Sequence, residues 1–296
     1  MRGLGTLIWR DTKLFFKDKG MFFTSMVTPL ILLLLFVTFL GNVYRESFSS
    51  LLDTCGVAVD NSLMEGFVGG WLFSSLLAVC CVTVAFCSNM LMVQDKVTGA
   101  RMDLTMAPVR SGTLAMGYYI STALSTLLIC LVALAACCIY LGKAGWYLSW
   151  QDLLLTCLDV FLLTMFGTAL SSVVNHFLST QGQMSAVGTV VSAGYGFICG
   201  AYMPISQFSD GIQRCISFLP GTYGTALLHN HLMRGTYGEL EELLPQQAMD
   251  SLREAFDSDL YFFDKEVSIG GMYGVMAVSV AALIAVYVLL SGRRAK

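Results

Sequence analysis

The sequence predicts an all-α polytopic membrane protein with six transmembrane helices. Its composition is strongly apolar, because 56% of the residues are hydrophobic and only 12% are charged, with a mean hydropathy of +0.69. Such a composition leaves little room for a large soluble domain. Six apolar stretches are each long enough, as helices, to cross a hydrocarbon core of about 30 Å. They lie at roughly 22–40, 67–92, 113–141, 153–175, 184–203 and 270–290.

The basic residues predict the orientation of these spans. If the N-terminus is cytosolic, eleven bases lie on the cytosolic side and six on the other. The cytosolic bases are Arg2, Arg10, Lys13, Lys17, Lys19, Lys96, Arg101, Arg110, Arg293, Arg294 and Lys296. Lys and Arg in short segments beside the spans set the topology of a membrane protein. We therefore expect a multi-pass protein of the plasma membrane with cytosolic N- and C-termini. The formal net charge of −3 averages a basic inner face and an acidic outer one and does not indicate nucleic-acid binding.

Residues 4–19 are predicted to form a helix that lies along the inner membrane surface. Leu4, Leu7, Ile8, Leu14 and Phe15 share one face at helical spacing, and Arg10, Lys13 and Lys17 lie opposite. Asp11 and Asp18 interrupt the apolar side. Either they lie at its edge, or that face contacts protein. The first apolar run is too long for a cleavable signal peptide.

Cysteine and histidine give no sign of a metal or cofactor site. Eight of the ten cysteines fall inside predicted spans, where a thiol behaves as a small apolar side chain. Cys55 and Cys215 lie outside, and a disulfide between them stays open. His229 and His231 lack partners at ligand spacing, so we expect ordinary loop residues there.

The motifs that the chain lacks restrict its function. It has no G-x-x-x-x-G-K-[ST] loop to hold a nucleotide phosphate, and no G-x-S-x-G or H-E-x-x-H motif. We expect a protein that is not an enzyme, and any pumping would take its energy from another polypeptide.

The segment 94–110, between the second and third predicted spans, is longer than a simple turn requires. It contains Asp95, Lys96, Arg101 and Asp103, is broken at Gly99, and is stopped at Pro108 because proline clashes with the preceding turn. One interpretation is an interfacial turn held by lipid phosphate. The other is a helix that docks into a cytosolic partner.

This segment resembles the cytosolic loop of the ABC-2 family of ABC-exporter permeases. The residues that match the family pattern in order are Asp95, Lys96, Gly99, Asp103, Leu104, Pro108 and Val109. The stretch after the fifth span agrees as well, through Gly200-Ala201-Tyr202-Met203-Pro204-Ile205, Phe218-Leu219-Pro220-Gly221 and Leu232-Met233-Arg234. The resemblance covers essentially the whole chain.

The resemblance implies a permease with six spans that pairs with a second permease subunit, as a homodimer or heterodimer. Two copies of a separate ABC ATPase would bind ATP and Mg, and this chain would bind neither. The surface helix 4–19 would be the connecting helix, and 94–110 would be the coupling loop, with Asp95, Lys96, Gly99, Arg101, Asp103 and Pro108 serving ATPase coupling.

The segment 204–268 is predicted to form an outer hairpin and cap. Between Met203 and Gly235 the chain is apolar in patches, but Pro204, Pro220 and nearby glycines break it too often for a crossing, which predicts a re-entrant or surface hairpin. The larger segment 234–268 is divided by Pro245 into two short helices, which either gate the exit or cover the spans.

Two features inside the predicted spans are candidates for a pathway or for helix packing. Gly188, Ser192, Gly196 and Gly200 recur every fourth residue, a ridge that lets another helix approach within the subunit, across a dimer or along a pathway. At this ridge, Gly196→Ala should be mild compared with Gly196→Leu. Asp159 is an acidic residue in a span interior and must find water, a donor or a proton.

Two other classes of function stay open. A channel-like or scaffold protein fits the spans equally well, but does not explain the elaborated 94–110 loop. An intramembrane enzyme would need converging polar side chains inside the spans, where Asp159 stands almost alone.

Overall fold

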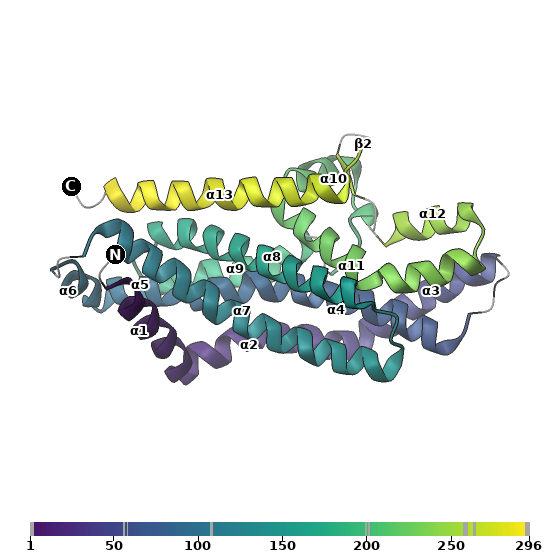
Figure 1. Cartoon of the computed structure of the whole chain (residues 1–296), viewed down its shortest axis with the longest axis horizontal. Helices are drawn as coiled ribbons and strands as arrows, with labels where there is room; N and C mark the ends of the chain where they lie inside the picture. Colours follow the sequence, from purple (N-terminus) through teal and green to yellow (C-terminus); the bar gives the residue numbers. More distant parts are fainter. Residues whose placement is uncertain are drawn as a thin grey trace.

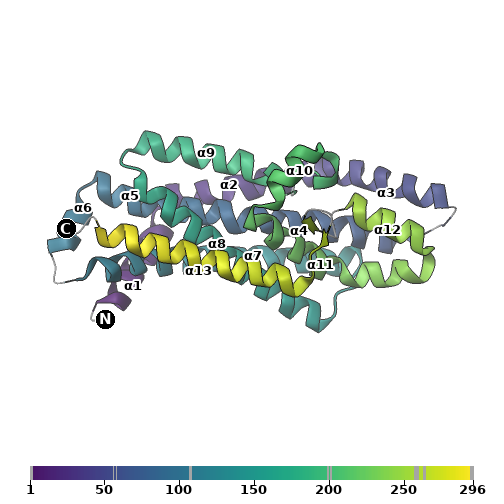
Figure 2. The same cartoon turned by 90° about the horizontal axis from the view of Figure 1, so that it is seen from above.

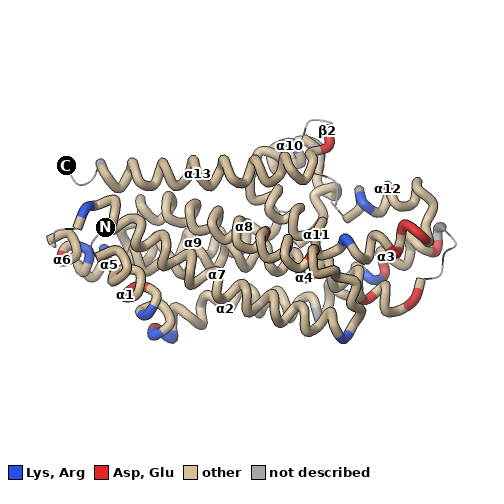
Figure 3. Tube along the Cα trace, in the orientation of Figure 1, with Lys and Arg blue, Asp and Glu red and all other residues tan. Residues whose placement is uncertain are grey.

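The structure is a computed structural model of an elongated, nearly all-helical molecule. It describes the chain except for residues 1, 2, 56, 58, 107, 108, 199, 201, 257–259, 263, 264 and 294–296, and the side chains of 37, 54, 55, 210, 254, 261, 265 and 293. Most of the long helices follow the long axis (Figures 1 and 2). Charged residues gather at the two ends, and the middle is nearly free of them (Figure 3). A bundle that crosses a membrane needs this distribution, because unpaired charge in hydrocarbon is costly.

Thirteen α-helices account for most of the described residues. They are α1 (Leu4–Lys17), α2 (Lys19–Leu35), α3 (Gly41–Cys55), α4 (Asn61–Ser88), α5 (Met90–Val97), α6 (Ala100–Met106), α7 (Ser111–Ala144), α8 (Trp150–Phe177), α9 (Gln181–Ile198), α10 (Asp210–Ser217), α11 (Pro220–Leu243), α12 (Gln246–Ala255) and α13 (Ile269–Arg293). A π-helical turn, η1 (Phe36–Leu40), joins α2 to α3, and a 3-10 turn, η2 (Ile205–Gln207), precedes α10. The strands β1 (Tyr261–Phe262) and β2 (Lys265–Glu266) pair antiparallel, with Tyr261 opposite Glu266.

Helix α4 lies at the centre of the bundle. Nearly all of its residues are buried, and it packs against α2, α7, α8, α9 and α11. Small residues allow the close approach: a Cβ at Gly69 would lie 3.0 Å from Leu141 of α7, and one at Gly70 would lie 3.4 Å from the Leu232 carbonyl oxygen of α11. An apolar helix without a polar face is expected in a core, and α4 occupies that position.

Five helical segments in the described part of the chain are long and apolar enough to cross a membrane. They are Lys19–Asp53, Asn61–Val97, Ser111–Ala144, Trp150–Phe177 and Ile269–Gly292. The first two are much longer than predicted, because helix continues through α3 and begins again at Asn61. The predicted span 184–203 corresponds to α9, which is not among the five, since Gln181, Gln183 and its glycines lower its hydropathy. Both ends of the chain lie at the same end of the molecule, beside α6 (Figure 1).

The prolines and glycines of 203–235 were expected to break the chain too often for a crossing, and the segment folds as the short helix α10 followed by the long helix α11, which is not among the five candidate spans. Helix α11 begins at Pro220, whose missing N–H costs nothing at the first helical position. Gly221 and Gly224 do not break it. A Cβ at either would lie 2.6 Å from a neighbouring side chain, Tyr195 of α9 or Leu163 of α8 respectively. These glycines therefore allow close contact, and Pro204 caps only the short turn η2.

The end of the molecule opposite α6 is built from α3, the start of α4, the end of α11, and α12 (Figure 1). Pro245 stands between α11 and α12, although the first of these helices is long rather than short. Phe256, just after α12, contacts Phe67 with ring centroids 4.9 Å apart, and its carbonyl oxygen accepts a hydrogen bond from Trp71 Nε1 at 3.3 Å. Helix α12 and Phe256 therefore cover the end formed by α3 and the start of α4. The sequence analysis did not predict that these helices extend so far.

Candidate functional site

Most of the residues predicted to serve coupling lie on α5 and α6 or in the turn between them, at the end of the molecule where α1 begins. Gly99 separates α5 from α6 with a φ of +82°. A Cβ there would meet nothing within 4 Å, so glycine is required by the backbone conformation and not by lack of space. Pro108 lies outside the described residues.

Asp95 is turned into the bundle. It is 4% exposed, and it accepts hydrogen bonds from Arg10 Nη1 at 2.8 Å, Arg10 Nη2 at 3.2 Å and the Tyr118 hydroxyl at 2.6 Å. The forked contact with Arg10 joins α1 to α5, and Tyr118 adds α7. Asp95 therefore fixes the position of α5 instead of presenting a charge to a partner.

Lys96 is also used internally. Its Nζ donates to the carbonyl oxygens of Asn175 at 2.8 Å, His176 at 2.9 Å and Leu178 at 3.0 Å. These are carbonyls at the C-terminal end of α8, where a cation complements the helix dipole. Lys96 ties α5 to α8, as the Asn89 amide does about two turns earlier by donating to the hydroxyls of Ser171 and Ser172 at 3.0 Å each.

Helix α6, in contrast, is largely outside the bundle. None of its residues is buried, and Met102 and Met106 are 66% and 81% exposed. Asp103 is exposed, and Leu104 packs against the cluster formed by Leu7, Met92 and Leu114. Of the predicted coupling residues, Asp103 therefore faces outward, whereas Asp95 and Lys96 do not.

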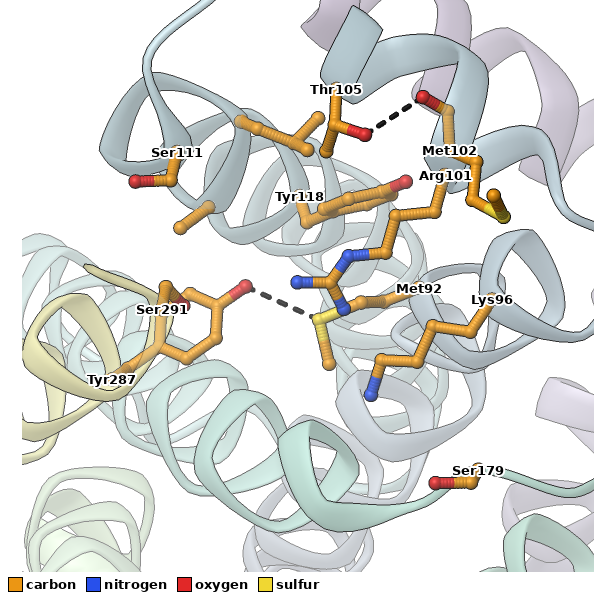
Figure 4. Close-up of a pocket in the computed structure, with 12 residues that line it drawn as sticks. Met92, Lys96, Arg101, Met102, Thr105, Ser111, Tyr118, Ser179, Tyr287 and Ser291 are labelled. Atoms are coloured by element: carbon orange, nitrogen blue, oxygen red, sulfur yellow. Dashed lines mark hydrogen bonds between the residues drawn. The ribbon is translucent and has the colours of Figure 1, made fainter. Parts of the chain in front are cut away.

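A cavity of about 420 Å³ lies behind α6, among α5, α7, α13 and the turn after α8 (Figure 4). The residues that line it are Met92, Lys96, Arg101, Met102, Thr105, Ser111, Leu114, Ala115, Tyr118, Ser179, Tyr287 and Ser291. The Arg101 guanidinium points into this space (Figure 4). The sequence analysis grouped Arg101 with Asp103 as coupling residues. In the structure, Arg101 lines the cavity, whereas Asp103 is exposed to the surroundings.

The apolar face of α1 contacts protein, which decides between the two interpretations of Asp11. Leu7 lies against Gly117 of α7, where a Cβ would be 3.2 Å from Leu7 Cβ. Asp11 is 1% exposed and accepts from Arg10 Nη1 at 2.7 Å. Burial raises the pKa of Asp11 to about 6, although the Arg10 charge opposes the shift. The pKa of Arg10 is raised above its ordinary value, chiefly by its hydrogen bond to Asp95.

The ridge on α9 packs within the subunit. A Cβ at Gly188 would lie 2.9 Å from Met90, and one at Gly196 would lie 2.3 Å from the Tyr202 ring. The Tyr202 hydroxyl donates to the Ser192 carbonyl oxygen at 3.2 Å, and Gly200 adopts a φ of +75° in the turn. The chain that follows α9 therefore folds back onto the ridge, and Gly196→Ala is no longer expected to be mild.

Asp159 does not stand alone. Its Oδ2 lies 2.5 Å from His231 Nδ1 of α11, and its Oδ1 accepts from the Tyr273 hydroxyl of α13 at 2.5 Å. Asp159 and His231 are 1% and 3% exposed, whereas Tyr273 is only partly buried, and the three groups join α8, α11 and α13. The sequence analysis did not predict that His231 and Tyr273 bind Asp159, because it assigned His231 to a loop. The apolar run Ala226–Leu228, followed by Leu232 and Met233, was the helical signal that placed it on a buried face.

His229 is likewise helical and buried, contrary to the expectation of a loop residue. Its Nε2 lies 3.0 Å from Ser75 Oγ, and its ring stacks on Trp71 with centroids 5.6 Å apart. Cys215 is exposed and free, whereas the side chain of Cys55 is outside the described part. In the described residues, no group of three or more His, Cys, Asp and Glu is placed to hold a metal ion.

The apolar helical bundle, with charges gathered at its ends, defines an integral membrane protein of the polytopic α-helical class. Comparison with protein families then identifies it further: residues 2–232 match the ABC-2 type transporter family, and the chain belongs to that family. The resemblance seen in the sequence is confirmed, and the chain is a transporter permease, a type of component that is generally not catalytic itself. The match ends within α11, before α12 and α13. A search of the curated proteins found no match.

The Gly196 contact predicts a difference between two glycines of α9. Gly196→Ala should lower the Tm of the detergent-purified protein, because overpacking costs about 1–3 kcal/mol. Gly194→Ala should leave the Tm unchanged or raise it slightly, because nothing lies within 4 Å of its Cβ and alanine favours helix. Equal Tm values for the two variants would contradict this packing.

For the Asp159 cluster, we predict that hydrogen bonding contributes more to the stability of the fold than the charge of Asp159 does. Asp159→Asn keeps an acceptor and a donor in place and should change the Tm little. Asp159→Leu leaves His231 and Tyr273 unpaired, at about 1–3 kcal/mol for each buried polar group, and should lower the Tm clearly. Tyr273→Phe removes one hydrogen bond, and its Tm should lie between the Tm values of the two Asp159 variants. The idea fails if the leucine variant is as stable as the asparagine variant.

The raised pKa of Asp11 predicts a pH-dependent stability difference. Because the folded pKa of about 6 exceeds the ordinary value of 3.8, the charged form destabilises the docked α1, and this cost grows as pH rises from about 4 through 6. Asp11→Asn should therefore have a higher Tm than wild type near neutral pH, with the difference vanishing toward about pH 4. The exposed Asp103→Asn should show no such trend. A difference that is constant with pH would refute the assignment.

Proposed function

We propose that this chain is the permease subunit of an ABC exporter, which forms the transmembrane path and is driven by a separate ABC ATPase. The observation that carries the proposal is α6, a short exposed helix held beyond the inner ends of the spans. Its outward residues Met102, Asp103 and Met106 have the mixed apolar and charged character of a protein-docking surface. Asp95 and Lys96 would then act indirectly, by fixing the helix that leads into α6.

The proposal includes six crossings with both termini cytosolic. Helix α9 supplies the remaining crossing: it runs beside the other helices (Figure 2), and its 18 residues span about 27 Å at 1.5 Å per residue. An even number of crossings agrees with the position of both ends beside α6 and with the bases predicted on that side. The hairpin of α10 and α11 then covers the outer half of the bundle.

Two permease subunits, identical or homologous, would assemble with two ATPase copies in the plasma membrane, and ATP and Mg would bind to the ATPase. The ABC-2 type transporter family supports this arrangement, since its permeases work with ABC ATPases in general. An intramembrane enzyme is less favoured, because both oxygens of Asp159 are already hydrogen-bonded and Asp159 itself is 1% exposed.

The docking role of α6 can be tested by charge reversal. Asp103→Lys should lower recovery of a co-expressed ABC ATPase by about tenfold, because it replaces an outward carboxylate by a repelling charge. Asp53→Lys, at an exposed position of α3 at the other end of the molecule, is the matched control and should not change recovery. Both variants should remain in the membrane. If they recover the ATPase equally, α6 is not the docking element, and α1 becomes the better candidate.

A further inference from the structure

We propose that the cavity behind α6 binds the headgroup of an anionic phospholipid from the inner leaflet, with the lipid phosphate at Arg101. The cavity volume of about 420 Å³ lies within the range of small-ligand pockets. The inference depends on the membrane placement of the bundle and not on ATPase docking.

The charge of the cavity favours an anion. Its lining includes the cations Lys96 and Arg101 and contains no Asp or Glu. The nearby Asp95 lies beyond the Tyr118 wall, where Arg10 and Tyr118 already bind its oxygens. A carboxylate that is neutralised in this way does not offset the field inside the cavity.

Arg101 is the group able to bind the phosphate directly. Within the described part of the chain, no hydrogen-bond or ion-pair partner lies in reach of its guanidinium, which points into the cavity (Figure 4). Guanidinium forms forked hydrogen bonds with phosphate oxygens. Lys96 donates to three carbonyls and therefore adds attraction without a direct bond.

Hydroxyl groups surround the same space. Ser111, Thr105, Ser179 and Ser291 all line it. The Thr105 hydroxyl donates to the Met102 carbonyl oxygen at 2.7 Å, whereas the hydroxyls of Ser111 and Ser179 are able to donate to phosphate or headgroup oxygens. Ser111 is also the first residue of α7, a helix of 34 residues whose N-terminal end carries partial positive charge.

The depth of the cavity fits the headgroup layer. Lys96 lies near the end of the candidate span Asn61–Val97, Ser111 begins Ser111–Ala144, and Ser291 lies at the end of Ile269–Gly292. Three spans therefore reach the same membrane boundary around the cavity. Met92, Leu114 and Ala115 line its other side and suit the glycerol and the upper acyl chain. A phospholipid contacts both the polar and the apolar residues of this lining, whereas free phosphate contacts only the polar ones.

The test uses the purified full-length chain and native mass spectrometry with an equimolar mixture of phosphatidylglycerol and phosphatidylcholine. Wild type should retain phosphatidylglycerol preferentially. Arg101→Gln should lower that preference about tenfold through loss of a charge-assisted hydrogen bond. Arg101→Lys should keep most of it, and Arg101→Glu should abolish it. Arg110→Gln is the control, because Arg110 is exposed at the same end of the molecule but does not line the cavity.

Three results would overturn the proposal. Arg101→Gln could keep the wild-type preference, or Arg110→Gln could lose it equally, which would indicate only a general attraction to a basic surface. A third arm adds excess inorganic phosphate to the detergent-solubilised wild type. Stabilisation by phosphate that depends on Arg101, without any preference for phosphatidylglycerol, would identify a free-phosphate site instead of a lipid site. Each variant is compared as a monodisperse preparation, and Arg101→Lys and Arg101→Glu decide the question if Arg101→Gln fails to fold.

Discussion

The burial of α4 on all sides is the constraint on which the rest of the structure depends. The helices packed around it approach closely because positions such as Gly69 and Gly70 have no side chain, and this places the end of α7 and the middle of α11. Helix α4 also continues through Asn89 into α5, so the same packing sets the inner end of the bundle. The position of α6 follows, since only Thr98 and Gly99 separate it from α5. The packing of α4 therefore determines the positions of both α11 and the exposed helix α6.

Polar side chains then lock the helices at the two ends of this bundle. At the inner end, Asp95 joins α1, α5 and α7, and Lys96 and Asn89 join the same segment to α8. Toward the outer end, Asp159 joins α8 to α11 and α13. In surroundings with little water, each such group must be paired, and unpaired ones cost several kcal/mol. Helix α8 takes part in both sets, so it links α11, which begins at Pro220, to the end of the bundle near α6.

The family and five of the six predicted spans could be predicted from the sequence because hydropathy and motif order depend on one segment at a time. The partners of charged residues could not. Asp95 and Lys96 resembled exposed loop charges, and only the three-dimensional packing shows that Arg10 and the carbonyls of α8 bind them. Gly221 and Gly224 resembled helix breakers, because sequence does not distinguish a glycine that frees the backbone from one that admits a neighbour. Assigning His231 to a loop followed from that error and concealed the Asp159 cluster.

The two proposed interactions meet on one short helix. Arg101 and Asp103 are two positions apart in α6, and residues at that spacing do not share a face of a helix. Arg101 is directed into the cavity, whereas Asp103 is exposed. Helix α6 is attached through Gly99 and through Leu104, which packs on the cluster of Leu7, Met92 and Leu114. If a lipid in the cavity favours one position of α6 and a docked protein favours the same one, each strengthens the binding of the other by the same factor. The geometry thus gives the membrane a physical route to influence docking, and that route needs no change in the packing of α4.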